Sequence, residues 1–201
     1  MVPPTQDLGR RDRKKHDTRD RLINEAARLF EANGFDQTTT TEIAEAADVA
    51  QRTLFRHFPT KEAVLFGDMV DLRFELRDAL AARPEGEPVI EVVRQAMLAL
   101  ADDHQRHADR RRVQFALAAA VPSISAYSRS VVQASWEREI ITAVADRLGV
   151  DPVDDPRPEI LAGAAMSALR VATRQWTAAG AGDNFVGLAD RALQTITDLD
   201  H

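Results

Sequence analysis

The chain has 201 residues, a hydrophobic content of 44%, a formal net charge of −6 and no cysteine. This length allows one domain of ordinary size, or a small and a medium domain, with enough apolar residues for a core. The lack of cysteine excludes a disulfide framework, a thiolate zinc site and a cysteine nucleophile. We expect no membrane span, because no apolar run of about eighteen residues occurs, and we expect a cytoplasmic protein without a secretory signal.

The charge is unevenly distributed along the chain. Residues 1–61 contain 11 basic and 10 acidic residues, whereas residues 62–201 contain 15 and 22. Basic side chains gather around the start of the first predicted helix: Arg10, Arg11, Arg13, Lys14, Lys15, Arg19 and Arg21. We expect residues 1–13 to form a disordered basic arm that holds DNA phosphates or enters a minor groove, the alternative being a solvated tail.

Apolar residues at helical spacing predict an all-α protein of about nine helices. The first helix is expected over residues 14–33 and ends at Gly34. A longer helix over residues 61–82 would link two domains. After a break rich in proline and glycine, the remaining helices are expected at about residues 89–107, 109–120, 123–148, 157–179 and 183–199.

Two short helical patterns joined by a tight turn lie within residues 34–62. Thr39 and Glu42 have the spacing of a capping box, so the first short helix should begin at about residue 40. Asp48 stands at the turn, and aspartate tolerates the left-handed backbone better than most residues other than glycine. The second short helix, residues 51–57, carries so many hydrogen-bonding side chains that it suits a DNA groove better than a core. A plain helical hairpin on a solvated surface is the alternative.

Residues 18–65 resemble the DNA-binding domain of TetR-family transcriptional regulators. The resemblance rests on these residues and their spacing: Ala26-Ala27-Arg28-Leu29-Phe30, Gly34-Phe35, Thr38-Thr39, Ile43-Ala44, Ala47-Asp48-Val49, Thr53-Leu54-Phe55-Arg56-His57-Phe58 and Lys61-Glu62. The chain has Asp48 and Phe55 where the family usually has Gly and Tyr, and a phenylalanine ring offers no hydroxyl to a phosphate.

The resemblance implies a dimeric, all-helical repressor that binds a palindromic double-stranded DNA operator and is released by a small-molecule inducer. It divides the chain into a three-helix helix-turn-helix domain, residues 14–60, and a ligand-binding and dimerisation domain, residues 61–201. The inducer would act through the linking helix over residues 61–82 by changing the spacing of the two reading helices. That spacing matters because both must fit successive turns of DNA, about 34–36 Å apart.

The second short helix is expected to enter a major groove. Gln51 and Arg52 are the candidates for base edges, because glutamine suits adenine and arginine suits guanine. The other candidate DNA-binding residues, mostly for the phosphate backbone, are Thr40, Thr41, Thr53, Phe55, His57 and Lys61.

The last two predicted helices, together about residues 157–199, carry apolar faces rich in small residues, which favour close helix packing. Some of these positions must be core within the chain. By resemblance, the two helices pair with their copies as a four-helix bundle in a homodimer.

The middle helices are expected to enclose the ligand. The candidate lining residues are Met97, Phe115, Tyr127, Trp136, Met166 and Arg170, with Arg174 as a further polar group. Ordinary core packing is the alternative for the aromatic and methionine members. The run Arg110-Arg111-Arg112 suggests either an attraction for anionic ligands or a solvated helix start. Residues 110–176 also resemble the C-terminal domain of the mycofactocin-regulator group, which implies a ligand of the fatty acyl-CoA type.

An enzyme is not expected, and neither is a cofactor or a metal. The sequence has no Gly-rich phosphate loop, no His-Glu-x-x-His pattern and no Gly-x-Ser-x-Gly elbow. His104 and His107, beside Asp102 and Asp103, leave a metal-binding enzyme as a distant alternative to a solvated polar face. The sequence is also compatible with a ligand-responsive activator that uses the same DNA-binding head, and with a helical adaptor that does not bind DNA.

Overall fold

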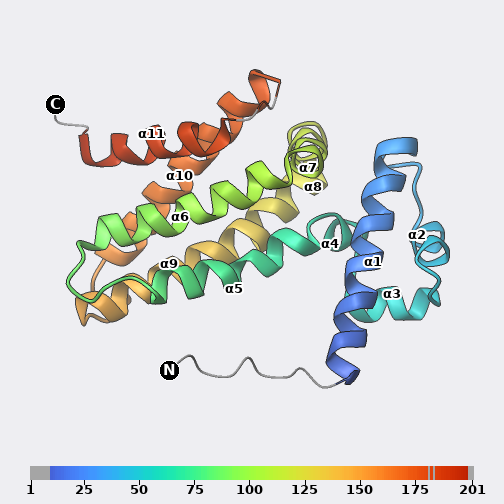
Figure 1. The fold of residues 1–201 in the computed structure, drawn as a ribbon, viewed down its shortest axis with the longest axis horizontal. Helices are drawn as coiled ribbons and strands as arrows, with labels where there is room; N and C mark the ends of the chain where they lie inside the picture. Colours follow the sequence, from blue (N-terminus) through green and yellow to red (C-terminus); the bar gives the residue numbers. More distant parts are fainter. Residues whose placement is uncertain (1–9, 181, 183, 199–201) are drawn as a thin grey trace. The chain divides into compact units, whose positions relative to one another are not determined.

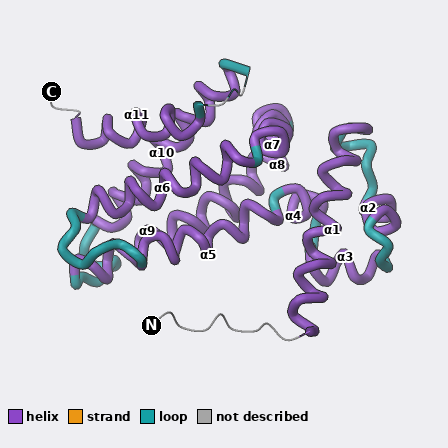
Figure 2. Tube along the Cα trace, viewed as in Figure 1, coloured by secondary structure: helices purple, strands orange, loops and turns teal. Residues whose placement is uncertain are grey.

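The computed structural model describes residues 10–180, 182 and 184–198, and all regular structure within them is helical (Figure 1). In chain order the helices are α1 (Arg10–Asn33), α2 (Thr40–Ala46), α3 (Gln51–His57), α4 (Lys61–Leu65), α5 (Gly67–Ala81), α6 (Val89–Arg106), α7 (Ala108–Ala120), α8 (Pro122–Tyr127), the π-helix η1 (Ser128–Gln133), α9 (Ala134–Leu148), α10 (Arg157–Ala178) and α11 (Phe185–Asp198). Short loops join them (Figure 2). The expected all-α fold is confirmed.

The chain divides into two compact units, Met1–Gly67 and Asp68–His201. The boundary falls after α4, rather than after residue 60 as expected from the sequence. Helix α1 begins at Arg10, so residues 10–13 are helical and do not belong to a disordered arm. The rest of the expected arm, residues 1–9, lies outside the described residues.

The N-terminal unit is a small bundle in which α1 packs against α2 and α4, and α2 packs against α3. Its core is formed by apolar side chains that are less than a tenth exposed: Leu22, Ile23, Ala26, Phe30, Phe35, Ile43, Ala44, Ala47, Leu54, Phe58 and Val64. Full burial of one such large side chain stabilises a fold by about 1.5–3 kcal/mol. Packing therefore holds helices as short as α2 and α3, which would be marginal in isolation.

The expected continuous helix over residues 61–82 is wrong, because the chain turns at Phe66 between α4 and α5. The side chain of Phe66 is fully buried. The next residue, Gly67, lies very close to Phe58 and Ile23. A Cβ atom at this position would be 2.6 Å from the ring of Phe58 and 3.0 Å from Ile23. Helical periodicity alone does not reveal this break, because apolar residues continue through it. The buried phenylalanine and the close glycine pin the end of α4 to the core of the N-terminal unit.

In the C-terminal unit, α10 packs against α9 and α11, and α11 packs against α6 (Figure 1). An ion pair between Arg94 and Asp190 joins α6 to α11. Helix α5 is held to α9 at both ends. The Trp136 indole donates to the Met69 carbonyl at 3.0 Å, and Arg147 donates to the carbonyls of Leu80, Arg83 and Pro84 at 3.3, 2.7 and 2.8 Å.

The expected helix over residues 123–148 is also interrupted. It consists of α8, the π-helix η1 and α9. The π turn adds one residue per hydrogen-bonded ring, which rotates the following helix relative to a continuous α-helix. Single π turns inside helices are rare and often lie at functional sites.

Candidate nucleic-acid interface and ligand cavity

The helix-turn-helix is shaped by local hydrogen bonds that the sequence predicted. The Thr39 hydroxyl accepts from the Glu42 amide at 3.2 Å, and the Glu42 carboxylate accepts from the Thr39 amide at 2.7 Å, which completes the capping box. Asp48 has a φ of +53°, so it adopts the left-handed backbone expected at the turn. The Val49 amide then donates to the Ala44 carbonyl at 2.9 Å.

Helix α3 buries one face in the core of the N-terminal unit and exposes the other face to solvent. Leu54 is fully buried and Phe58, its C-cap, is 2% exposed. Gln51 and Arg52 are exposed, and Thr53 and His57 are half-buried. Phe55 is 46% exposed, so it stands on the outer face rather than in the core. A short helix with this division has the form of a recognition helix.

The two base-reading candidates differ in their surroundings. The Gln51 amide donates to the hydroxyls of Thr40 and Thr41 at 3.2 and 2.9 Å, so three of the predicted contact residues form one cluster across α2 and α3. Arg52, in contrast, has no ion pair or hydrogen bond from its side chain to another described residue. The guanidinium of Arg52 is therefore available to a ligand without losing an internal contact.

Lys61 differs from the expected phosphate contact. Its ammonium donates to the carbonyls of Phe35 and Thr38 at 2.6 and 3.1 Å and lies 4.2 Å from the centre of the Phe35 ring. The side chain is thus directed into the loop between α1 and α2, where it satisfies two backbone acceptors. In this structure Lys61 therefore stabilises the loop that precedes α2.

His57 lies in a positively charged neighbourhood. Partial burial, followed by the charges of Arg56, Arg19 and Lys15, lowers the pKa of His57 below its ordinary value of 6.5. Arg19 also stacks over the Phe58 ring at 4.4 Å and donates to the Gly67 carbonyl at 3.0 Å. A phosphate near these groups would neutralise part of their charge and favour the protonated imidazole.

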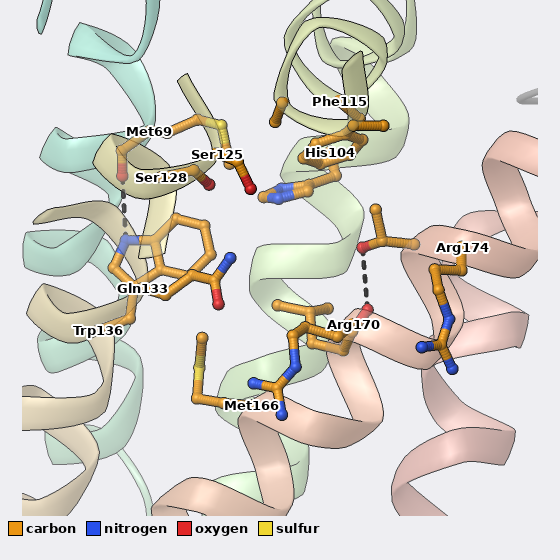
Figure 3. Close-up of a pocket in the computed structure, with 14 residues that line it drawn as sticks. Met69, His104, Phe115, Ser125, Ser128, Gln133, Trp136, Met166, Arg170 and Arg174 are labelled. Carbon is orange, nitrogen blue, oxygen red and sulfur yellow. Dashed lines mark hydrogen bonds between the residues drawn. The ribbon is translucent and has the colours of Figure 1, made fainter. Parts of the chain in front are cut away.

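A cavity of about 280 Å³ lies within the C-terminal unit (Figure 3). The residues that line it are Met69, His104, Phe115, Ala118, Ala119, Ser125, Ser128, Gln133, Trp136, Met166, Leu169, Arg170, Thr173 and Arg174. They come from α5, α6, α7, α8, η1, α9 and α10. Four of the six expected ligand residues therefore line one cavity: Phe115, Trp136, Met166 and Arg170, together with Arg174.

The other two expected residues, Met97 and Tyr127, do not line this cavity. Met97 is fully buried in α6, on the same face as His104 but two turns earlier, which is about 10 Å along the helix. Tyr127 lies two residues after Ser125 in α8, and residues two apart point to different sides of a helix. Both residues belong to helices that contribute to the cavity wall, and their role as ligand contacts stays a prediction.

Sequence reasoning missed His104 as a buried residue and interpreted it as part of a solvated face. It is 1% exposed. Its ring lies 5.5 Å from Phe185, 5.6 Å from Phe115 and 5.8 Å from Trp136 between ring centres. A usable signal was present, because His104 continues the apolar face of Val93, Met97, Leu100 and Ala101 at helical spacing.

The basic run at residues 110–112 was also misread. Arg111 is 1% exposed, and neither a solvated helix start nor an open anion site describes it. Its guanidinium donates to Asp68 at 2.6 Å, to Gln114 at 2.8 Å and to Asp103 at 2.8 Å. Burial alone would raise the pKa of Asp68, but the charge and hydrogen bond of Arg111 outweigh it, so this pKa is lowered.

This buried ion-pair cluster stands directly behind the cavity. Each of three members is followed in the sequence by a lining residue: Asp68 by Met69, Asp103 by His104, and Gln114 by Phe115. Asp68 is also the first residue of the C-terminal unit and lies in the first turn of α5. The cluster therefore connects the cavity wall with the segment that follows Gly67.

Two negative findings concern other classes of protein. Among the residues with described placement, no group of three or more histidine, aspartate or glutamate side chains could hold a metal ion. No single helix in the same set is long and apolar enough to cross a membrane. Only the pair Ala108–Ala120 and Pro122–Leu148, bent by 109°, meets the length and composition requirements together.

The helix-turn-helix and the cavity-bearing helical unit have counterparts in known proteins. The family model for bacterial regulatory proteins of the tetR family matches residues 22–67, and the chain belongs to this family of DNA-binding transcriptional regulators. The model for the MftR C-terminal domain matches residues 87–199, so the C-terminal unit is of the mycofactocin-regulator type. The family consists of regulators, and the enzyme alternative built on His104 and His107 is set aside.

Individual relatives agree with this assignment. The chain is 34% identical over 173 residues to the regulator TcmR of Streptomyces glaucescens, covering 84% of this chain and 76% of that protein. It is 30% identical over 155 residues to the putative regulator MftR of Mycobacterium tuberculosis, covering 71% of each. Among solved structures, the Thermus thermophilus repressor FadR in complex with lauroyl-CoA is 26% identical, with a TM-score of 0.57 over 91% of this chain and 95% of that one.

Proposed function

We propose that this regulator is a homodimeric repressor that leaves a palindromic operator when a small molecule occupies the cavity of the C-terminal unit. The observation that carries the DNA-binding part is the outer face of α3, where Gln51 and Arg52 are exposed on a helix fixed from behind by Leu54 and Phe58. The protein would act in the cytoplasm, where its DNA target lies.

In this proposal α3 enters the major groove of each half-site. Arg52 reads a guanine through two hydrogen bonds, and Gln51 reads an adenine after exchanging its contacts with Thr40 and Thr41. The two threonine hydroxyls released by this exchange then bind phosphates, together with Thr53 and His57. Phe55 supplies ring packing against the DNA backbone. Lys61 contributes indirectly, by holding the loop that precedes α2.

The homodimer would form through α10 and α11, about residues 157–199, of which the described part ends at Asp198. The apolar faces of these helices are divided between two uses. Ala165, Ala172, Phe185 and Ala189 are fully buried within one chain. A second set remains open: Ile160 is 66% exposed, and the partly exposed members are Leu161, Ala164, Leu188, Ala192 and Ile196. This second set is the proposed dimer contact.

The cavity would receive the inducer, and the similarity to FadR with lauroyl-CoA supports an amphiphilic ligand such as a fatty acyl-CoA. Occupation of the cavity would be sensed by α5. Met69 lines the cavity, and its neighbour Asp68 is held by Arg111 in the first turn of that helix. A shift of this turn would be passed to the chain at Gly67 and so to the spacing of the two reading helices.

The decisive experiment is the selection of bound duplexes from a random pool with purified wild-type protein. We expect a palindrome whose half-sites are separated by one helical turn or a multiple of it. Recovery of no common sequence would contradict the proposal. Addition of lauroyl-CoA to the recovered complex should then release the duplex, and the absence of release would contradict the acyl-CoA part alone.

The base-reading role of Arg52 is tested on the same palindrome. Arg52→Ala should cost about 1–3 kcal/mol and relax the preference at one position of each half-site. Arg28→Ala is the matched control, because Arg28 is exposed on α1 and pairs with Glu25 of the same helix. An equal loss on every duplex would make Arg52 a phosphate contact instead.

A further inference from the structure

One side chain in the cavity lining, His104, is buried and has a ring nitrogen that no described residue pairs with in good hydrogen-bond geometry. The Nδ1 atom of His104 is inaccessible to solvent and makes no hydrogen bond of good geometry to a described residue; the Leu100 carbonyl, one turn earlier on α6, offers it only a weak, poorly aligned contact. An oxygen of Asp103 lies 3.9 Å from this nitrogen, too far for a hydrogen bond. Buried polar atoms without a partner are costly and rare in native proteins, so this one calls for a functional explanation.

The surroundings keep this histidine neutral. Burial, and then the charge of Arg111, hold the pKa of His104 well below its ordinary range, although the Asp68 carboxylate and the Leu100 carbonyl act in the opposite direction. His107 adds a further lowering effect. A neutral imidazole carries one donor and one acceptor nitrogen. The best partner for such a ring is a hydroxyl group, because it can donate or accept as the tautomer requires.

The ring is held so that its polar edge faces the cavity. Phe185 stacks on it with an interplanar angle of 7°, and Phe115 and Trp136 lie beside it. Figure 3 shows the nitrogen-bearing edge of His104 turned toward the space between Trp136, Met166 and Ser128. The histidine is thus a polar point fixed among aromatic rings, in a wall that also contains Met69, Met166 and the polar side chains of α8, η1 and α10.

A second polar region lies on α10, where Arg170 and Arg174 border the cavity and are exposed to solvent. None of the residues that line this cavity is an aspartate or a glutamate. The lining therefore carries positive charge on its α10 side, and Gln133 and Ser128 from the π-helix η1 add neutral hydrogen-bonding groups. This distribution favours a ligand with an anionic end, an apolar body and a polar group at depth.

We propose that the cavity takes an amphiphilic anion that carries a hydroxyl group, with the anionic end at Arg170 and Arg174 and the hydroxyl group against His104. The inference rests on the proposed ligand-binding role of the cavity and narrows its ligand class. It makes His104 the residue that distinguishes a hydroxylated ligand from its plain hydrocarbon analogue, because a site with an unpaired polar group rejects the analogue that leaves it unpaired.

The test uses three probes of equal chain length in calorimetric titrations of the purified full-length protein without DNA. They are 12-hydroxydodecanoate, dodecanoate and 1,12-dodecanediol. We expect the hydroxy acid to bind about 10-fold more tightly than dodecanoate, which is the effect of one net hydrogen bond. It should bind about 3-fold more tightly than the diol, because exposed arginines contribute little. Equal or tighter binding of dodecanoate or the diol, or binding of none of the three, would overturn the proposal.

Variants then assign the hydroxyl effect to His104. His104→Phe should remove the preference for the hydroxy acid over dodecanoate, whereas His104→Gln, which keeps a donor and an acceptor, should retain part of it. Arg112→Gln, outside the lining, is the matched control and should keep the full preference. A full preference in His104→Phe would overturn the assignment. Because no DNA is present, these results are independent of whether an operator is recovered.

Discussion

The two units of this regulator use polar side chains in opposite ways. In the N-terminal unit the helix caps are local contacts near the surface: Thr39 with Glu42, and Thr60 with the Ala63 amide. In the C-terminal unit, Arg111 is buried and joins Asp68 and Asp103 across 43 and 8 residues of sequence. A solvated cap is worth about 1 kcal/mol, whereas breaking a buried ion pair costs about 3–5 kcal/mol. Among these polar contacts, the stability of the N-terminal unit thus depends on several small contributions. The stability of the C-terminal unit depends heavily on the one buried cluster around Arg111.

The largest expected effect comes from Arg111→Leu. This change leaves the carboxylates of Asp68 and Asp103 without their buried cation, and we expect a loss of about 3–5 kcal/mol in the free energy of unfolding of the C-terminal unit. The measurement is urea unfolding followed by tryptophan fluorescence. Both tryptophans, Trp136 and Trp176, belong to this unit, so the signal reports it alone.

Arg112→Leu is the control for this measurement, because its side chain is 51% exposed and pairs at 3.7 Å with the fully solvated Asp109. We expect a change within about 0.5 kcal/mol. If the two variants had similar effects, the contrast between a buried cluster and a solvated surface would be wrong.

Lys61→Met tests whether a polar contact between residues distant in the sequence also stabilises the N-terminal unit. The change removes the donor to the Phe35 and Thr38 carbonyls, and we expect about 1–3 kcal/mol of local destabilisation, seen as faster amide hydrogen exchange in α2 and its preceding loop. The salt dependence of DNA binding should keep its slope. A slope lower by about one would instead restore Lys61 as a phosphate contact. Arg28→Met serves as the control.

The pH dependence of stability should differ between the units because of His104. The unfolded chain binds a proton at this residue near pH 6.5, whereas burial lowers its pKa in the folded state. Stability is therefore complete above pH 6.5 and decreases as the pH falls, by up to about 1.4 kcal/mol per pH unit, until the folded pKa is reached. Asp68, with its lowered pKa, adds a separate loss only below about pH 4.

His104→Phe should abolish the slope between about pH 6.5 and 5 when unfolding is followed by tryptophan fluorescence. His57 also has a lowered pKa but lies in the N-terminal unit, so His57→Gln should leave this fluorescence-detected slope unchanged. A slope that persists in His104→Phe would show that another group carries the pH dependence.

The smallest expected effect is that of Thr39→Ala, which removes one side of the capping box. We expect a loss of about 1 kcal/mol, confined to α2 and measurable by hydrogen exchange. Thr41→Ala, on the same helix, has no capping role in the protein and is the control. If Thr39→Ala also destabilised the C-terminal unit, the capping contact would not be local, and the contrast between the two units would be wrong.

Much of the N-terminal unit could be predicted because its signals are local. The bounds of α3, the capping box at Thr39 and the left-handed Asp48 all follow from residues fewer than five positions apart. The break at Phe66 could not be predicted in this way, because it accompanies the close approach of Gly67 to Phe58 and Ile23, which are distant in the sequence.

In the C-terminal unit α6, α7, α10 and α11 were predicted with nearly correct ends, the expected helix over residues 123–148 is interrupted, and four of the six expected ligand residues line one cavity. The errors share one cause. Arg111 and His104 were judged by residue type and helical spacing, but their environments depend on contacts with Asp68 of α5 and Phe185 of α11.

The sequence by itself determined the helical fold, the family, the bounds of α3 and the cap of α2, because periodicity and capping act within one or two turns of chain. Only the tertiary structure decided that Arg111 is a buried cation, that His104 is a buried ring with a lowered pKa and that Lys61 is directed inward. Each of these depends on carbonyls, carboxylates or aromatic rings brought together by packing of distant segments. Burial and charge environment are properties of that packing, and a linear pattern of residues does not contain them.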